Sequence, residues 1–444
     1  MNGGTSFTGL TGKNRFPVYV SPVTMELINT GSELLLGRVL NTHLQWLGRQ
    51  LTDRGYTLKR QVAVPDGGRD IQAAVREALG RADFIITTGG LGPTSDDLTR
   101  ELIAGLLGRA LHHDATVEHA IRHYFESRGR PVPARTKVEA QVPEGARVLP
   151  NRQGTAPGLV LVVDPNPFRP DGRRSVLVML PGPPRELRPM FTQEVVPVLT
   201  EYFPPAEPFA CRTLRTTGLG ESFIEERIDG PLAPLVQSGM DLGYCAKVGE
   251  VEVRFVARGP QAVTTVATAE AITRGLIGEF IFGTDDDTLE GAVLQRFTQQ
   301  KQTLALAESC TGGHIANRLT NVPGASAVLL AGYVTYANEA KIRTLGVRPE
   351  TLRDHGAVSE ATAREMAEGA RRISGADWAV AVTGIAGPDG GTPEKPVGTV
   401  FLAWAGPHGT TSARQLNPFD RETFKFLTAQ QGLHGLLTAP TARP

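Results

Sequence analysis

Cysteine and net charge are both scarce in this 444-residue sequence. The three cysteines, Cys211, Cys245 and Cys310, lie far apart and form no pair with the spacing of metal ligands. Lys plus Arg (46) equal Asp plus Glu (46), so the chain has no bulk electrostatic reason to coat nucleic acid or an anionic membrane. We therefore expect a reduced, cytoplasmic protein that does not bind nucleic acid.

Long apolar runs are missing as well. No run reaches the roughly 18 residues that a membrane-spanning helix needs, which excludes a membrane protein of that type. Residues 1–24 are rich in Gly, Thr and Ser and lack the apolar core of a signal peptide. We expect this segment to be a disordered tail.

The length of the chain predicts more than one hydrophobic core. Residues 25–205 alternate strand-like and helix-like segments. Strands are expected at Leu58–Val64 and Phe84–Thr88, and helices at Arg38–Leu51 and Ile71–Leu79. Alternation of this kind implies parallel strands joined by helical crossovers, and hence an α/β domain.

Two further regions follow. Residues 206–283 contain the alternating strand Glu250–Ala257 and are read as a small α+β module. The polar segment Gly283–Asp287 is a candidate linker. Residues 288–440 return to strands and helices in alternation, beginning with the strand Thr303–Ala307. The predicted fold class is therefore α/β, with two α/β domains joined by the small module.

The last domain has polar or glycine-rich turns directly after its predicted strands. These turns are Ala307–Gly313, Gly332–Lys341 and Thr383–Gly391, and Lys395–Thr399 opens another strand. The carboxyl ends of strands are where α/β sheets build their sites. The three turns together, rather than any one glycine loop, predict an active site at this edge.

Individual residues in these turns admit two interpretations. Ser309 stands where helix amides and the helix dipole would stabilise an alkoxide, but serine before a helix is also a common N-cap. Lys341 can act as a general base only if its pKa is depressed; otherwise it is a solvated helix residue. Tyr336 is either part of the site or simply an aromatic residue at the end of a strand. A thiol mechanism at Cys310 lacks a suitable histidine, because His314 shares the same helix start.

The residues Leu289–Leu437 resemble the C-terminal domain of the CinA (competence/damage-inducible) family, which also occurs alone as nicotinamide-nucleotide amidase. Tyr336 and Lys341 follow Ser309 by 27 and 32 residues, the spacing of that family. The resemblance implies that Ser309 is the nucleophile and that Lys341 deprotonates it, directly or through Tyr336. The implied reaction converts nicotinamide mononucleotide to nicotinate mononucleotide and ammonia, without a cofactor.

The same resemblance implies a set of substrate-binding residues in turns and near the last helix. They are Thr311, Gly312, Gly313, Thr383, Gly384, Gly387, Arg421 and Lys425. Backbone amides near Ser309 or in the Thr383–Gly387 turn would stabilise the oxyanion. Two residues depart from the family pattern: Phe419 replaces a glycine, and Lys425 stands where arginine is usual. A lysine cannot bind phosphate in the bidentate manner of arginine.

The densest motif of the first half is the stretch Thr87–Glu101, which reads TTGGLGPTSDDLTRE. Its glycines allow backbone amides to approach an anion. Asp96 and Asp97 are expected to begin the following helix, where they would serve as N-caps or as ligands of a hard divalent cation.

Together with Thr30–Gly37, Asn151–Gly158 and Leu180–Glu186, this stretch resembles the molybdopterin-binding fold in its CinA version. The resemblance implies metal-dependent hydrolysis of ADP-ribose. The implied substrate-binding residues are Glu33, Gly89, Gly90, Gly92, Thr94 and Gly182. Asp96 and Asp97 would hold Mg²⁺, Mn²⁺ or Co²⁺. The module at 206–283 resembles the small KH-like unit of the same proteins.

Two other functions compete with a pair of enzymes in pyridine-nucleotide salvage. The chain could be a non-enzymatic adaptor in DNA uptake or recombination, but an adaptor needs none of Ser309, Tyr336 and Lys341. Alternatively, it could be a molybdopterin-handling enzyme. The fused C-terminal domain argues against this function, and the fold alone does not decide between them. The partners expected are small nucleotides, with a homodimer as the commonest assembly.

Overall fold

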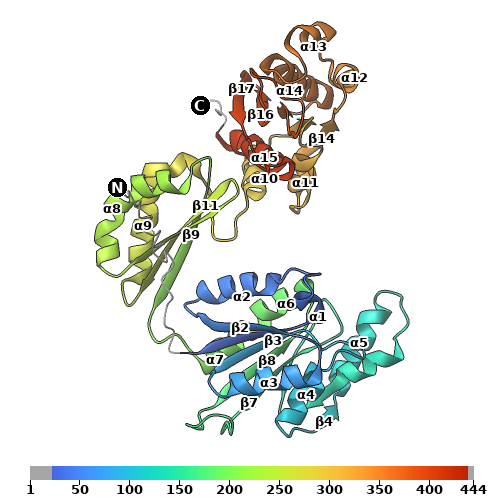
Figure 1. Ribbon diagram of the computed structural model, residues 1–444, viewed down its shortest axis with the longest axis vertical. Coiled ribbons are helices and arrows are strands. Elements are labelled where there is room, and N and C mark those ends of the chain that lie inside the picture. Colours follow the sequence, from blue (N-terminus) through green and yellow to red (C-terminus); the bar gives the residue numbers. More distant parts are fainter. Residues whose placement is uncertain (1–22, 439–444) are drawn as a thin grey trace, which may run out of the picture. The chain divides into compact units, whose positions relative to one another are not determined.

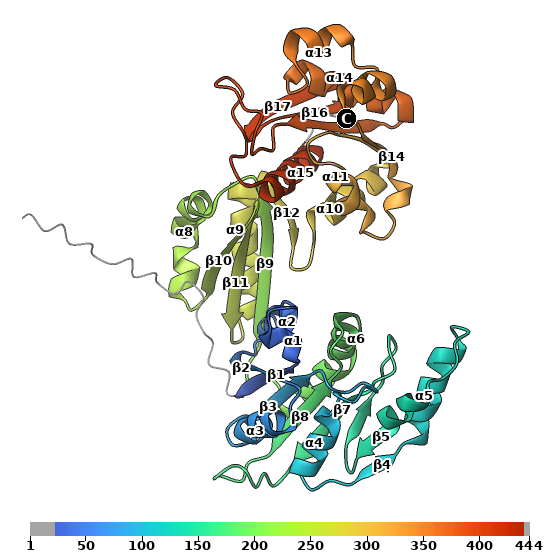
Figure 2. The same ribbon diagram turned by 45° about the vertical axis from the view of Figure 1, so that its right-hand side comes forward.

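The computed structural model describes residues 23–438. The tail predicted at residues 1–24 therefore lies, except for Val23 and Thr24, outside the described residues. The chain divides into two compact units, one ending at Ala210 and the other beginning at Cys211. Each unit is described by itself, and Figures 1 and 2 draw the ribbon of both.

The first unit is built on a six-stranded sheet of order β2-β1-β3-β8-β7-β6. Strands β1, β2, β3 and β8 are parallel, whereas β6 and β7 are antiparallel to their neighbours. Its strands are β1 (Met25–Thr30), β2 (Leu58–Val64), β3 (Phe84–Thr88), β4 (Leu111–His113), β5 (Gln141–Pro143), β6 (Arg147–Leu149), β7 (Gly158–Val163) and β8 (Ser175–Leu180). Its α-helices are α1 (Ser32–Leu35), α2 (Thr42–Thr52), α3 (Gly68–Leu79), α4 (Thr99–Leu106), α5 (Ala115–Glu126), α6 (Pro184–Met190) and α7 (Val196–Tyr202).

Helices cover both faces of this sheet, as Figure 1 shows. Side chains alternate across a strand, so Leu27 and Ile86 pack against α2, α6 and α7. Ile28 and Ile85 pack on the opposite face against α3, α4 and α5. Burial on both faces explains why the central strands are apolar throughout.

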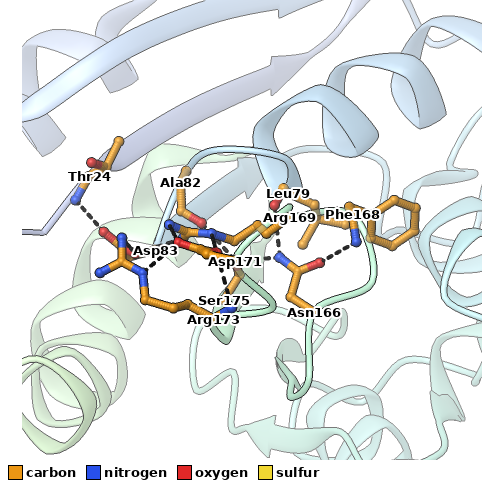
Figure 3. A network of polar contacts seen from close by, with 10 residues as sticks. All are labelled: Thr24, Leu79, Ala82, Asp83, Asn166, Phe168, Arg169, Asp171, Arg173 and Ser175. Carbon is orange, nitrogen blue, oxygen red and sulfur yellow. Dashed lines mark hydrogen bonds and ion pairs between the residues drawn. The ribbon is translucent and has the colours of Figure 1, made fainter.

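A buried ion pair fixes the loop between β7 and β8. The guanidinium of Arg169 donates to Asp83 at 2.7 Å and to Asp171 at 3.0 Å (Figure 3). The other oxygen of Asp83 accepts from the backbone amide of Thr24, and Asn166 bonds to Ser175 within the same network. These contacts lie at the end of the sheet where β3 begins, away from its carboxyl edge.

The second unit begins with the small module, whose sheet has the order β10-β11-β9-β12. Its elements are β9 (Phe209–Thr217), α8 (Glu221–Gln237), β10 (Asp241–Lys247), β11 (Glu250–Arg258), α9 (Ala262–Ile277) and β12 (Ile281–Thr284). Val253 and Phe255 of β11 are buried beneath the helices, as the alternating pattern of that strand requires.

The rest of the second unit is a five-stranded sheet of order β14-β13-β15-β16-β17. Strands β14, β13 and β15 are parallel, and β16 and β17 are antiparallel. Its strands are β13 (Leu304–Glu308), β14 (Leu329–Val334), β15 (Trp378–Gly384), β16 (Thr399–Gly406) and β17 (Gly409–Leu416). Its α-helices are α10 (Leu289–Gln300), α11 (His314–Thr320), α12 (Asn338–Ala340), α13 (Pro349–His355), α14 (Glu360–Ser374) and α15 (Arg421–Thr438).

This sheet also has a core on each face. Leu304 and Leu306 pack with α10, α11 and α15, whereas Ala305 and Ala307 pack with α14. Phe282 of β12 joins the first of these cores, so the module and the last domain share buried surface. The predicted architecture, two α/β domains and a small α+β module, is confirmed.

The expected strands β2 and β3 have the predicted bounds. The helix expected at Arg38–Leu51 begins only at Thr42, because the side chain of Asn41 caps it by accepting from Leu44 N. The expectation that Asp96 and Asp97 begin a helix is wrong, since α4 begins at Thr99. Within residues 23–438, no helix is long and apolar enough to cross a membrane.

Candidate active site

Ser309 and Lys341 meet at the carboxyl edge of the second α/β sheet. Ser309 follows β13, and its amide donates to Val382 O at 3.0 Å, which fixes the turn to β15. Lys341 begins the π-helical turn η5 (Lys341–Leu345) that continues α12. Lys341 Nζ lies 3.1 Å from Ser309 Oγ. The predicted nucleophile and base are therefore in direct hydrogen-bond contact.

The amine of Lys341 has two further oxygen neighbours. Its Nζ donates to Thr335 O at 2.8 Å and to Tyr336 O at 3.1 Å. The lysine is only 1% exposed, and burial lowers its pKa. A neutral amine has two protons and one lone pair. Ser309 Oγ is a third acceptor of Nζ, and a neutral amine that donated its two protons to the carbonyls would turn its lone pair toward this hydroxyl.

The side chain of Tyr336 lies elsewhere. It is 61% exposed, and its hydroxyl accepts a hydrogen bond from Arg421 at 2.8 Å. Arg421 also donates to Gly387 O at 2.8 Å. Tyr336 thus touches Lys341 through its backbone carbonyl, and its ring belongs to a polar group with Arg421. Of the two expected proton routes, the direct one from Ser309 to Lys341 has a contact.

Glu308 organises the nucleophile turn and was not anticipated. Its buried carboxylate accepts from Thr311 Oγ1 at 2.7 Å and from the amide of Gly313 at 3.0 Å. It also accepts from the amides of Ile315 and Ala316 in the first turn of α11. The helix N-terminus is therefore capped by Glu308, which removes the alternative of Ser309 as an N-cap. The signal in the sequence was a carboxylate at the end of an otherwise apolar strand.

This cap changes the role expected of two substrate-binding residues. The hydroxyl of Thr311 and the amide of Gly313 are already bonded to Glu308, and Thr311 is buried. Gly312 donates its amide to Ser309 O at 3.1 Å. These groups shape the turn, and in the Thr383–Gly387 turn the amide of Ile385 is likewise bonded, to Thr399 O at 2.8 Å.

The Thr383–Gly387 turn is held by contacts of its own. Thr383 is buried, and its hydroxyl donates to Ala357 O at 2.8 Å. A side chain at Gly384 would approach Thr399 O to 2.8 Å, and one at Gly387 would approach Val397 to 2.6 Å. The sheet edge therefore requires glycine at both positions.

Lys425 of α15 reaches the nucleophile turn. A Cβ atom added to Gly312 would lie 3.9 Å from Lys425 Nζ. Asp420 precedes this helix and accepts from the amides of Glu422 and Thr423, which orients its first turn. Arg421 and Lys425 are thus two cations beside the turn that carries Ser309.

The neighbouring Cys310 is chemically inert at neutral pH. Burial raises the pKa of its thiol to about 12, and a thiol rather than a thiolate is a poor nucleophile. Of the two adjacent hydroxyl and thiol groups, only Ser309 has a base in contact.

The first unit has a second candidate site at the carboxyl edge of its own sheet. A cavity of about 380 Å³ is lined by most of the residues expected there, namely Glu33, Gly89, Gly90, Gly92, Asp96, Asp97 and Gly182. Gly89 and Gly90 have φ of 98° and 68°, and a side chain at Gly90 would approach Thr99 Oγ1 to 2.0 Å. Thr94, the remaining expected residue, donates its amide to Asp97 Oδ2 at 2.9 Å.

The metal ligands expected in this cavity form an incomplete set. Asp97 caps the Thr94 turn, and Asp96 is exposed. No group of three or more His, Cys, Asp or Glu within residues 23–438 is arranged to hold a metal ion. Asp96 and Asp97 alone do not fit a protein cage, and a cation here would need phosphate oxygens and water as its other ligands.

Two buried carboxyl groups in the same cavity were not anticipated. Glu139 accepts from Thr155 Oγ1 at 3.0 Å, and burial raises its pKa to about 7. Glu186 accepts from Asn151 at 2.8 Å, and a side chain at Gly154 would collide with it. Both residues come from segments whose sequence has no periodic pattern, so their position depends on the tertiary fold.

Comparison with known proteins assigns all three parts of the chain. A probable molybdopterin binding domain matches residues 26–201, a damage-inducible protein CinA KH domain matches 211–283, and a CinA C-terminal domain matches 286–439. A CinA-like protein of Akkermansia muciniphila is 46% identical over 95% of this chain and 99% of its own. Another, from Anaeromyxobacter dehalogenans, is 41% identical over 94% and 99%.

A solved structure of a competence/damage inducible protein from Agrobacterium tumefaciens is 45% identical in sequence. It covers 34% of this chain and 92% of its own, with a TM-score of 0.33.

The Glu308 cap generates a stability prediction. Replacing Glu308 with glutamine should lower the free energy of unfolding by about 1.5–3 kcal/mol, because an amide nitrogen cannot accept the bond from at least one backbone donor. Urea denaturation measures the change, with the exposed Glu350→Gln as the matched control. Equal stability of the two variants would show that the cap is dispensable.

Proposed function

The chain belongs to the CinA family, and from that membership and the contact between Ser309 and Lys341 we propose a function for its C-terminal domain. The domain hydrolyses the amide of nicotinamide mononucleotide to nicotinate mononucleotide and ammonia. The observation that carries the proposal is the buried amine of Lys341, 3.1 Å from a serine hydroxyl. A lysine without a catalytic role gains nothing from losing its hydration in this place.

The reaction follows from this geometry in two stages. Ser309 Oγ attacks the amide carbon while its proton passes to Lys341 Nζ. Collapse of the tetrahedral intermediate breaks the carbon–nitrogen bond, and the proton on Lys341 goes to the departing nitrogen as ammonia leaves. Water then attacks the ester on Ser309, with Lys341 again accepting a proton, and the acid is released. The chemistry needs no cofactor.

The surrounding groups fit a charged nucleotide. Arg421 and Lys425 lie beside the nucleophile turn and can pair with a phosphate. Arg421 is also held by the Tyr336 hydroxyl and Gly387 O, so its guanidinium is oriented before substrate arrives. Tyr336 therefore serves in substrate binding through Arg421, and in catalysis through its carbonyl contact with Lys341.

The rival role as an adaptor in DNA uptake gains no support from this site. An adaptor has no use for a desolvated lysine aimed at a serine, and the neutral net charge of the chain gives no attraction to DNA.

A second activity is proposed for the first unit, namely hydrolysis of ADP-ribose. The observation that favours it is the cavity of about 380 Å³, in which the glycine turn faces Asp97. Backbone amides near Gly89–Gly92 can hold a pyrophosphate, and the family's molybdopterin-binding-like domain provides the frame. A divalent cation would contribute charge neutralisation, although the protein alone supplies an incomplete ligand set. Nucleotide salvage would link both activities.

The serine–lysine pair predicts a non-additive loss of deamidation. Lys341→Met keeps the volume of the buried chain and removes its amine, so the rate should fall by about 10²–10⁴-fold. Ser309→Ala should abolish the reaction, and the double variant should be no worse than Ser309→Ala because the two groups act as a unit. Ammonia release from nicotinamide mononucleotide measures all three.

The exposed Lys137→Ala provides the control for loss of a lysine charge. Thermal unfolding of each variant establishes that it is folded. Lys341→Met with near-normal activity would contradict a base at this position, and an active Ser309→Ala would indicate direct attack by water.

The N-terminal proposal predicts a separate effect. Asp97→Ala should lower ADP-ribose hydrolysis by about 10–100-fold, the usual loss when a ligand shell is disturbed, and should leave deamidation intact. Asp70→Ala, an exposed change in α3, is the control. Normal ADP-ribose hydrolysis by the Asp97 variant would contradict a catalytic role and show that Asp97 only caps the Thr94 turn.

A further inference from the structure

A second cavity is lined by both cations of the proposed deamidation site, Arg421 and Lys425, but not by Ser309. Its volume is about 750 Å³. It is lined by residues of α11, α15 and the turn between β10 and β11, namely Val248, His314, Arg421, Glu422, Thr423, Lys425 and Phe426. The cavity is far larger than a phosphate group requires and falls in the range of sites for drug-sized ligands.

The two cations stand between this cavity and the catalytic pair. Lys425 reaches toward Gly312, three residues from Ser309, and Arg421 is tied to Tyr336 and Gly387 at the sheet edge. A mononucleotide with its amide at Ser309 and its phosphate at these cations would leave the rest of the cavity empty. A larger ligand would fill this space with a second group attached to that phosphate.

The far wall has the chemistry of a base-binding surface. The guanidinium of Arg318 lies 5.0 Å from the centre of the Phe426 ring and holds it, and the His314 ring lies 6.1 Å from the same ring. His314 Nε2 is buried and has no hydrogen-bond partner among the described residues. Burial and the nearby Arg318 and Lys425 lower the pKa of His314, which favours the uncharged ring in this wall of the cavity.

The edge of the cavity comes from the KH module. Val248 is 51% exposed at the tip of the β10–β11 turn. The next residue, Gly249, packs against α15, since a side chain there would lie 3.0 Å from Leu427. Gln430 of α15 donates to Glu250 at 3.0 Å and to Thr217 at 3.2 Å. The turn is thus fixed against the helix that carries both cations, and both ribbon views place the ends of β9 and β11 near α15 (Figures 1 and 2).

We infer that this cavity binds the second half of a dinucleotide whose nicotinamide half occupies the substrate site. The inference rests on the proposed deamidase function. The pyrophosphate pairs with Arg421 and Lys425, and the second base lies against Phe426, His314 and Val248. A π-faced base on an aromatic wall, with anionic charge on two cations, makes each part of the cavity complementary to this ligand. The KH module thereby contributes to nucleotide recognition through Val248.

Competitive inhibition tests the inference on the intact chain. Oxidised nicotinamide adenine dinucleotide should compete with nicotinamide mononucleotide in the deamidation assay. Val248→Trp places an indole in the volume that the second base would occupy, so the ratio of the dinucleotide Ki to the mononucleotide KM should rise by about tenfold or more. Val263→Trp, an exposed change on α9 of the same module, should leave that ratio unaltered.

Two results would overturn the inference while the proposed function stands. One is active deamidation without competitive inhibition by the dinucleotide, and the other is inhibition that Val248→Trp leaves unchanged. Absence of deamidation would instead overturn the proposed function. In that case calorimetric binding of the dinucleotide, weakened by Val248→Trp but not by Val263→Trp, would still support the subsite, and equal binding by both variants would reject it.

Discussion

The second unit depends on one constraint, the burial of an amine that has no carboxylate partner within residues 23–438. Lys341 loses its hydration at the sheet edge and receives two backbone carbonyls and one serine hydroxyl in return. Neutral oxygens compensate an ammonium ion poorly, so the neutral amine is favoured. In the neutral amine, the two protons are donated to the carbonyls of Thr335 and Tyr336, and the lone pair would then point toward Ser309 Oγ. The same desolvation that costs stability lowers the pKa of the amine, as the proposed base requires.

The fold supplies this arrangement through its strand ends. β13 and β14 are adjacent and parallel, so Ser309 and the Thr335–Tyr336 carbonyls emerge at the same edge. Glu308 keeps the turn after β13 in place by satisfying the amides of α11. From there Arg318 bonds to Gln430, which in turn bonds to the KH module. The module and the catalytic turn are therefore joined by a continuous set of hydrogen bonds through α15.

Sequence patterns anticipated the strands well and the polar contacts unevenly. Phe84–Thr88 was predictable because a short buried run with strand propensity is typical of a central strand, and Leu58–Val64 because it lies between two helical patterns in an alternating α/β order. Arg38–Leu40 was mistaken for helix, since Val39 and Leu40 have helical spacing yet are exposed. The pairing of Ser309 with Lys341 was predicted from the spacing in a known family, and the structure places the two side chains in contact. Glu139 was missed because its partner Thr155 comes from another segment, which only tertiary packing brings close. Glu308 was missed although its partners, Thr311 to Ala316, are local in the sequence.

Lys341 can act as a general base only if its amine is neutral, and nuclear magnetic resonance can measure this protonation state directly. In protein with isotopically labelled lysine, the side-chain signals of Lys341, assigned by comparison with Lys341→Met, report the pKa as pH is raised. If Lys341 is the base, its amine should titrate clearly below the value of about 10.4 for an unperturbed lysine. Titration together with the exposed lysines would mean that the amine is charged at neutral pH. That result would contradict a general base at this site.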